Sequence, residues 1–305
     1  MGWALLAGLL ALYYAPFLRE ALRPNLSEAD RARAPGRFAD LPRGRTHYRW
    51  HGPPDGQVII CIHGLTTPSF VWTPIAEGLA AQGFRVLTYD HYGRGYSDRP
   101  RGAHDLAFYD DHLSALLDHL GVTAPVTLFG YSMGGAIAAS FAAAHPDRTV
   151  RAVLLAPAGL GHDLGGVARI VARRKWLGRW LVLATYANFY RAALEEDRAL
   201  ATPELPDVVD LQLKELDYRG FIPAVWSSLY HALDHDLFDE HRRIAAAGTP
   251  LTAIWAADDE IIPVAGAEKI ATLNPAAANA VIENATHAVA YTHPSEVLSN
   301  FPTPR

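Results

Sequence analysis

The chain has 305 residues, half of them hydrophobic, with 24 glycines and a single cysteine. This length suits one large α/β domain with an insertion, or two modest domains, and allows a sizeable core. The net charge of -5 and the lack of a basic block argue against nucleic acid as a partner. The single Cys61 excludes an intrachain disulfide framework, and its apolar surroundings predict a buried strand residue.

The first predicted element is an apolar N-terminal helix. From Trp3 to Phe17 the sequence carries no charge, a length between a signal-peptide core and a full membrane span. No basic residue precedes Arg19, and no convincing signal-peptide cleavage site follows. We therefore expect residues 3–17 to form an uncleaved membrane anchor. A cleaved signal peptide and a helix packed on the protein or on a partner are the alternatives.

A polar connector completes the N-terminal region, residues 1–40. Five basic residues follow the apolar segment: Arg19, Arg23, Arg31, Arg33 and Arg37. Basic residues that flank a membrane span favour the cytoplasmic side. We therefore expect the inner or cytoplasmic membrane as the location, with the body of the protein on the cytoplasmic side.

Apolar runs then alternate with helix-length segments from residue 41 to 160. The runs are QVIICIHG, FRVLTYD, VTLFG and RAVLLAPAG, and helical segments are expected at 74–82 and 107–120. Residues 248–305 resume the pattern with TPLTAIWA and NAVIEN. Such alternation predicts an α/β fold, with a mostly parallel central sheet covered by helices on both faces.

Residues 161–247 interrupt this alternation. The stretch is rich in helix formers and aromatic residues, lacks a clear strand signal and is too long for a loop. We expect an inserted helical cap over the carboxyl edge of the sheet, where open α/β folds bind their ligands. Its segment VARIVARRKWLGRWLVLATYANFY mixes arginines with tryptophans and aliphatic residues. This composition fits either a membrane interface or a helix that lines its own pocket.

The stretch LFGYSMGG places Ser132 in a tight turn between a predicted strand ending at Phe129 and a helix beginning near Met133. Gly130 and Gly134 permit close backbone approach around the serine. The turn exposes the serine oxygen at the start of the helix, which is typical of a nucleophile. An ordinary serine in a glycine-rich turn is the alternative.

A serine nucleophile needs a base and a group that orients the base. Asp258 and Asp259 end the predicted strand TAIWA, and His287 and His293 follow the run VIEN. The chain order of serine, acid and histidine is that of folds in which each group comes from a different strand end. The sequence therefore supplies candidates for all three roles.

Five motifs from about Gly44 onward resemble those of α/β-hydrolase-fold serine hydrolases of the capped, esterase and monoacylglycerol lipase-like branch: HGLTTPSFVW, YDHYGRGYSDRP, GYSMGG, DDEIIP and THAVAYTHP. In this family the acid usually lies four residues before a proline, and the histidine seven residues before one. This resemblance favours Asp259 over Asp258 and His287 over His293. Thr286 departs from the pattern, because glycine is commoner at that position.

The resemblance implies a mechanism for hydrolysis of carboxylic esters. Ser132 would attack the acyl carbonyl, His287 would take its proton, and Asp259 would orient the histidine. The backbone N–H groups of Leu65 and Met133 would form the oxyanion hole. No cofactor and no metal ion are implied. The expected substrate is a small-molecule ester with a lipid-like acyl group, of the monoacylglycerol or lysophospholipid type.

The sequence is also compatible with other functions. The same triad serves lactone hydrolysis and cleavage of a vinylogous carbon–carbon bond, and perhydrolysis is conceivable as a side activity. A ligand-binding receptor without turnover is the alternative from another class. Family members that open epoxides or displace halide carry aspartate at the position of Ser132, which argues against those two reactions.

Several polar residues are expected to be structural. His63 resembles a family position that places the oxyanion loop. Asp90, Arg94, Ser97 and Asp98 would hold their own loop by hydrogen bonds. The histidine-rich stretch HALDHDLFDEHRR fits a solvated cap helix better than a metal site.

Overall fold

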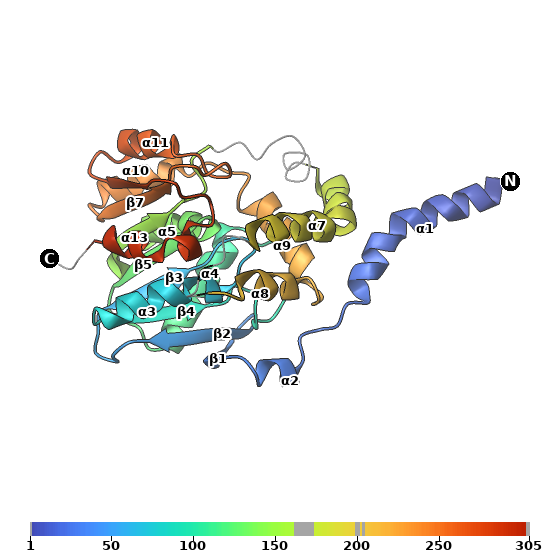
Figure 1. The fold of residues 1–305 in the computed structure, drawn as a ribbon, viewed down its shortest axis with the longest axis horizontal. Helices are drawn as coiled ribbons and strands as arrows, with labels where there is room; N and C mark the ends of the chain where they lie inside the picture. Colours follow the sequence, from blue (N-terminus) through green and yellow to red (C-terminus); the bar gives the residue numbers. More distant parts are fainter. Residues whose placement is uncertain (1, 162–173, 199–201, 203–204, 303–305) are drawn as a thin grey trace.

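An eight-stranded sheet forms the centre of the protein (Figure 1). The structure is a computed structural model that describes residues 2–161, 174–198, 202 and 205–302. The strands are β1 (Arg37–Leu41), β2 (Gly44–His51), β3 (Val58–Ile62), β4 (Arg85–Tyr89), β5 (Val126–Tyr131), β6 (Thr149–Leu155), β7 (Leu251–Ala256) and β8 (Ala278–Ile282). Their order is β1-β2-β4-β3-β5-β6-β7-β8. The pairings β1 with β2 and β2 with β4 are antiparallel, and all others are parallel. The predicted mostly parallel α/β sheet is therefore confirmed.

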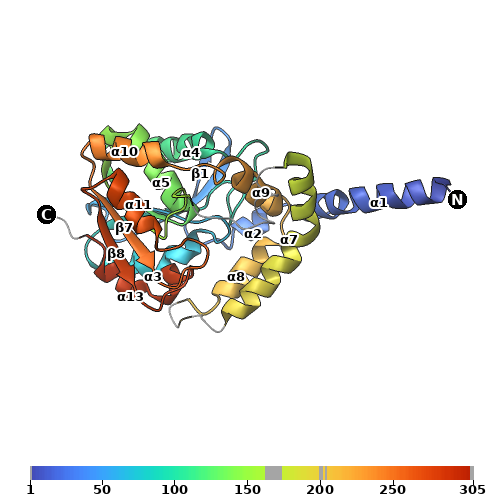
Figure 2. The same cartoon turned by 90° about the horizontal axis from the view of Figure 1, so that it is seen from above.

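Helices cover both faces of this sheet, as Figures 1 and 2 show. One face is covered by α3 (Thr73–Ala81), α12 (Val289–Thr292) and α13 (Pro294–Ser299), and the other by α4 (Leu106–His119), α5 (Met133–Ala144), α10 (Phe238–Ala246) and α11 (Gly266–Leu273). Side chains of a strand point alternately to the two faces. In β3, Ile59 and Cys61 pack on the first face, and Ile60 and Ile62 pack on the second. The apolar run VIICI is thus buried on both sides, and Cys61 is a core residue as expected.

In the described part of the chain after β6, helix α7 (Lys175–Asp197) packs on α8 (Val208–Glu215) and on α9 (Phe221–His231). They contact the loops that follow β3 and β4, so they lie at the carboxyl edge of the sheet. Helix α10 falls within the range expected for the cap, yet it packs against α5 and α11 beside the sheet. Its His241 and Ile244 face inward and are fully buried. The boundaries 161 and 247 stay predictions, and Arg169 and Arg173 of the basic segment lie outside the described residues.

The N-terminal helix α1 (Gly2–Ala21) projects from the body in Figures 1 and 2. It is long enough and apolar enough to cross a membrane, and the exposed fractions of Trp3 and Leu5 are 85% and 68%. Its C-terminal half packs on α7, where Trp180 Nε1 donates a hydrogen bond of 3.0 Å to the Tyr13 carbonyl. A short helix α2 (Glu28–Arg31) then leads into β1.

Candidate active site

Ser132 occupies a sharp turn between β5 and α5. Its backbone has φ 56° and ψ -119°, a conformation that costs a non-glycine residue about 1–3 kcal/mol. A Cβ on Gly134 would overlap the Ile62 carbonyl oxygen, and a Cβ on Gly130 would overlap the Gly134 carbonyl. The Ser132 amide donates a 2.9 Å hydrogen bond to the Leu155 carbonyl of β6. Glycines and the neighbouring strand therefore hold the serine in this strained position.

His287 and Asp259 form a hydrogen-bonded chain with Ser132. His287 Nε2 lies 2.9 Å from Ser132 Oγ, and His287 Nδ1 lies 2.7 Å from Asp259 Oδ2. The second carboxylate oxygen, Asp259 Oδ1, accepts hydrogen bonds from the backbone amides of Ile261 at 2.8 Å and Ile262 at 2.7 Å. The Asp259 side chain is completely buried. The three residues favoured by the sequence thus lie in contact, although they come from three separate loops.

The other acid and histidine candidates lie outside this chain of contacts. Asp258 is exposed, and His293 Nδ1 lies 2.8 Å from the Thr292 hydroxyl. The loop that carries His287 is tied to β5, because the Tyr131 hydroxyl donates a hydrogen bond to the His287 carbonyl. Thr286, which replaces the commoner glycine, leaves the contacts of His287 intact.

The two amides expected to form an oxyanion hole belong to the residue after Ser132 and to the residue after Gly64, which lies against the serine. Met133 is the first residue of α5, so its N–H has no partner within the helix. Gly64 lies against the serine, since an added Cβ would be 3.3 Å from Ser132 Cβ, and Leu65 follows directly. Among the described residues neither the Leu65 nor the Met133 amide donates a hydrogen bond. Both donors are therefore available to an anion that forms beside the serine.

Two neighbouring histidines, His63 and His91, hold the loop that carries Leu65. His63 Nδ1 lies 2.9 Å from the Gly64 carbonyl, and His63 Nε2 accepts a 2.9 Å hydrogen bond from the His91 amide. Burial lowers the pKa of His63 to about 4. A neutral ring with its proton on Nδ1 satisfies both contacts. These contacts fit the positioning role expected for His63.

Arg94 connects the same loop to the cap. Its guanidinium is buried and donates to the Leu65 carbonyl at 3.0 Å, the Tyr109 hydroxyl at 3.1 Å and the Ser228 hydroxyl at 2.8 Å. The sequence predicts hydrogen bonds of Arg94 within its own loop, but it does not predict these contacts with other elements. Ser228 lies 134 positions further along the chain, a contact that no local pattern indicates.

Polar side chains of the cap also reach the oxyanion loop, and sequence reasoning did not identify them. Gln212 Nε2 donates a 2.6 Å hydrogen bond to the Thr67 hydroxyl, and both residues are buried. Tyr186 and Tyr190 stack at a centroid distance of 5.3 Å. Within the part of the chain that the structure describes, their hydroxyls have no hydrogen-bond partner. Burial raises the pKa of both phenols, so both are neutral donors in the cap.

The described residues contain no cluster of three or more histidine, cysteine or acidic side chains suited to a metal ion. Burial raises the pKa of the Cys61 thiol, so the thiolate that a nucleophile or metal ligand requires is disfavoured. Ser132, with His287 as its base, is therefore the candidate nucleophile.

The sheet order, the strained serine and the acid and histidine at neighbouring strand ends define one class of protein. A model of the α/β hydrolase fold family matches residues 57–294, and the chain belongs to this family. It is 33% identical over 159 residues to the cis-3-alkyl-4-alkyloxetan-2-one decarboxylase of Xanthomonas campestris, which covers 48% of this chain and 53% of that protein. It is 27% identical over 268 residues to a non-heme chloroperoxidase of Streptomyces lividans, covering 83% and 92%.

A solved structure resembles almost the whole chain, including the region of α1. It is described as a membrane phospholipase A and bacterial virulence factor, with a TM-score of 0.70, 19% identity and coverage of 98% of this chain and 95% of that one. At this identity the likeness shows the fold alone. Among the curated relatives, the chain spans 53% of the decarboxylase and 34% of three mycobacterial proteins.

Proposed function

We propose that this protein is a serine hydrolase that cleaves carboxylic esters through an acyl-enzyme. The observation that carries the proposal is the continuous chain of contacts from Ser132 Oγ through His287 to Asp259, with distances of 2.9 and 2.7 Å. A serine hydroxyl is a weak nucleophile until an adjacent base accepts its proton. The relatives and structural neighbours include esterases, which supports the same reaction class.

The reaction follows from the roles of these groups. His287 Nε2 accepts the proton as Ser132 Oγ attacks the acyl carbonyl, and Asp259 stabilises the imidazolium that forms. The amides of Leu65 and Met133 donate to the carbonyl oxygen while it carries negative charge. His287 returns the proton to the leaving alcohol, and water then opens the acyl-enzyme with the same base. No cofactor or metal ion takes part in this scheme.

The proposed substrate class is a lipid-like acyl ester, of the monoacylglycerol or lysophospholipid type, met at a membrane surface. The exposed apolar face of α1 supports membrane association, and the aromatic and aliphatic cap supports an apolar acyl group. Burial of a methylene group contributes about 0.8 kcal/mol, or about fourfold in binding per methylene. Affinity should therefore rise with acyl length until the site is filled.

A series of p-nitrophenyl esters from acetate to palmitate tests this proposal. The wild type is compared with Ser132→Ala and with a variant that lacks residues 2–15 but keeps the contacts of Phe17 and Glu20 with the body. We expect loss of activity with Ser132→Ala and a maximum at medium or long chains. If a fluorophosphonate labels Ser132 but the protein cleaves only the acetate ester, the triad assignment stands and the lipid substrate is refuted. No labelling and no turnover would favour the receptor alternative.

A lactone is the second candidate substrate. The observation in its favour is the 33% identity to a protein named for an oxetan-2-one, which is a four-membered lactone. Opening of a lactone by Ser132 gives an acyl-enzyme whose alcohol stays attached, so the same residues serve. A kcat/KM for alkyl β-lactones above that for all p-nitrophenyl esters would favour this candidate.

A further inference from the structure

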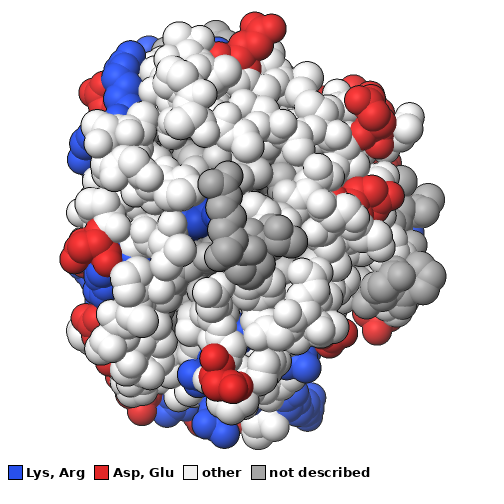
Figure 3. Space-filling model, turned by 90° about the vertical axis from the view of Figure 1, so that its left-hand side faces the viewer, with Lys and Arg blue, Asp and Glu red and all other residues white. Residues whose placement is uncertain are grey.

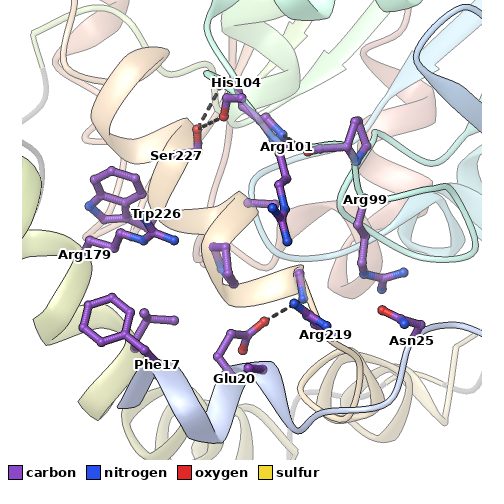
Figure 4. A pocket seen from close by; sticks show the side chains of 17 residues that line it. Phe17, Glu20, Asn25, Arg99, Arg101, His104, Arg179, Arg219, Trp226 and Ser227 are labelled. Atoms are coloured by element: carbon purple, nitrogen blue, oxygen red, sulfur yellow. Dashed lines mark hydrogen bonds between the residues drawn. The ribbon is translucent and has the colours of Figure 1, made fainter. Parts of the chain in front are cut away.

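A cavity lies away from the catalytic groups, at the foot of α1 (Figure 4). It has a volume of about 740 Å³, and Ser132, Asp259 and His287 are not part of its lining. The C-terminal turn of α1, the loop after β4 and helices α7 and α9 form its walls. We call it the juxtamembrane pocket, and its charged lining consists of Arg99, Arg101, Arg179, Arg219 and Glu20.

The charges of this pocket are strongly unbalanced. Glu20 is already engaged, because it accepts a 2.7 Å hydrogen bond from the Gly220 amide and lies 3.3 Å from Arg23. Among the described residues, Arg101, Arg179 and Arg219 have no carboxylate within ion-pair distance. The face of the molecule turned away from α1 differs, since both charge signs are scattered over it (Figure 3). The pocket is therefore a local site for a negatively charged group.

Arg99 adds a buried donor to this site. Its side chain is only 8% exposed and lies 3.4 Å from Glu215, while its Nε has no hydrogen-bond partner among the described residues. A guanidinium in the wall of the pocket favours an anion such as phosphate by its charge. The site thus combines surplus positive charge with a largely buried arginine.

Apolar groups stand beside the arginines. Arg179 lies 5.8 Å from the Phe17 ring centroid and 6.0 Å from that of Trp226, and all three side chains line the pocket (Figure 4). The uncharged segment 3–17 of α1 ends at Phe17, so the pocket begins where the apolar helix stops. If that segment lies in lipid, the arginines stand at the depth of the headgroups.

We propose that the juxtamembrane pocket binds the phosphate headgroup of an anionic phospholipid. This inference rests on the proposed membrane association of α1, and it is independent of the catalytic role of Ser132. The arginines would hold the phosphate oxygens, and Phe17 and Trp226 would contact the start of the acyl chains. The bound lipid would fix the orientation of the body against the membrane and thus the position of the cap.

Binding of soluble short-chain lipids to the full chain in nonionic detergent tests the proposal. The Ser132→Ala background prevents hydrolysis, and isothermal titration calorimetry measures the binding. The probes are dihexanoylphosphatidylglycerol, dihexanoylphosphatidylcholine and inorganic phosphate. We expect the anionic lipid to bind most tightly. The double variant with Arg101→Gln and Arg219→Gln should bind this lipid about 30-fold more weakly, which is ~2 kcal/mol at about 1 kcal/mol per arginine.

The matched control replaces Arg242 and Arg243 of α10 by glutamine. This changes the net charge by the same amount on an element away from α1, so the affinity for the anionic lipid should stay unchanged. Arg101→Gln alone alters an exposed side chain and keeps the test valid if the double variant misfolds. Equal binding of the two lipids, or no effect of the pocket variants, would overturn the proposal. Phosphate binding as tight as that of the lipid would make the pocket a free-anion site instead. Flotation of wild type with phosphatidylcholine vesicles tests membrane association separately.

Discussion

At the scale of single residues, the site depends on strain that its neighbours hold in place. Ser132 adopts φ 56°, and a side chain at Gly130 or Gly134 would collide with backbone carbonyls. The turn places Oγ 2.9 Å from His287 Nε2 without any movement of the histidine. A side chain added at Gly130 or Gly134 would therefore change the geometry of the nucleophile rather than the packing of the core.

The triad residues should differ in how much activity their loss removes. Ser132→Ala and His287→Ala each remove a group that forms or breaks bonds, so kcat should fall about a million-fold. Asp259→Asn keeps the shape but not the charge beside Nδ1, so the fall should be smaller, about ten-thousand-fold. Steady-state kinetics with a soluble p-nitrophenyl ester measures these ratios. Asp258→Asn, at the exposed neighbouring acid, is the control and should retain wild-type kcat. A larger loss in Asp258→Asn than in Asp259→Asn would contradict the assignment.

At the scale of elements, the loops after β3 and β4 and the cap helix α9 are tied together by one buried guanidinium. Arg94 donates to Leu65, Tyr109 and Ser228, which lie on three different elements. Lysine carries the same charge but cannot reproduce this planar set of donors. We therefore propose that Arg94 positions the loop that carries Leu65.

Replacement of Arg94 by lysine should affect both stability and catalysis. We expect the free energy of unfolding to fall by about 2–4 kcal/mol, since charged hydrogen bonds are lost in a buried site. Loss of the contact with the Leu65 carbonyl should lower kcat about tenfold or more at unchanged folding. Urea denaturation and ester kinetics measure the two effects. Arg148→Lys, at a surface pair with Asp118, should stay within about 0.5 kcal/mol of wild type. Equal stability of both variants would refute the role of Arg94.

Asp90, which follows β4, forms a buried ion pair with His47 of β2. Asp90 Oδ2 lies 2.8 Å from His47 Nδ1, and the carboxylate accepts further hydrogen bonds from the amides of Ser69 and Tyr96, each at 2.9 Å. Burial alone would raise the pKa of Asp90, but His47 and these donors hold it well below its ordinary value. Burial would lower the pKa of His47, but the charge and hydrogen bond of Asp90 raise it.

These opposite shifts predict a pH window for stability. The depressed pKa of Asp90 gives stability above about pH 4 that is lost in acid, and the raised pKa of His47 gives stability below about pH 6.5 that is lost as pH rises further. The difference in unfolding free energy between wild type and Asp90→Asn should therefore be greatest between pH 4 and 6.5. Urea denaturation from pH 3 to 9 measures it, with Asp118→Asn as the surface control. A difference that is constant with pH would contradict the pair.

At the scale of the whole molecule, the parallel strands could be predicted from sequence, but the two strands with antiparallel pairings, β1 and β2, could not. VIICI of β3 is apolar throughout because helices cover both faces. RFADL of β1 and GRTHYRWH of β2 lack that signal. In β2 the buried Thr46 hydroxyl pairs with His112 Nε2 at 2.8 Å, a partner 66 positions away. Burial of such polar strands depends on distant partners, which a local pattern does not contain.

The same distinction applies to the candidate site. The elbow at Ser132 and the strand ends that carry Asp259 and His287 follow from local motifs, and the structure has these residues in hydrogen-bond contact. Gln212 of α8 reaches Thr67 only through the folding of the cap onto the sheet, and Arg94 reaches Leu65 from the loop of a different strand. Their positions depend on tertiary packing, so no motif identifies them. The catalytic roles themselves stay predictions.

The most direct test of the central claim is mass spectrometry of the enzyme quenched in acid during turnover of p-nitrophenyl butyrate. An acyl-enzyme mechanism predicts a butyryl group on the peptide that contains Ser132, together with a burst of p-nitrophenol of about one equivalent where deacylation is slow. The Ser132→Ala variant should show neither. Turnover that persists in Ser132→Ala, or an acyl group found on another residue, would contradict the account.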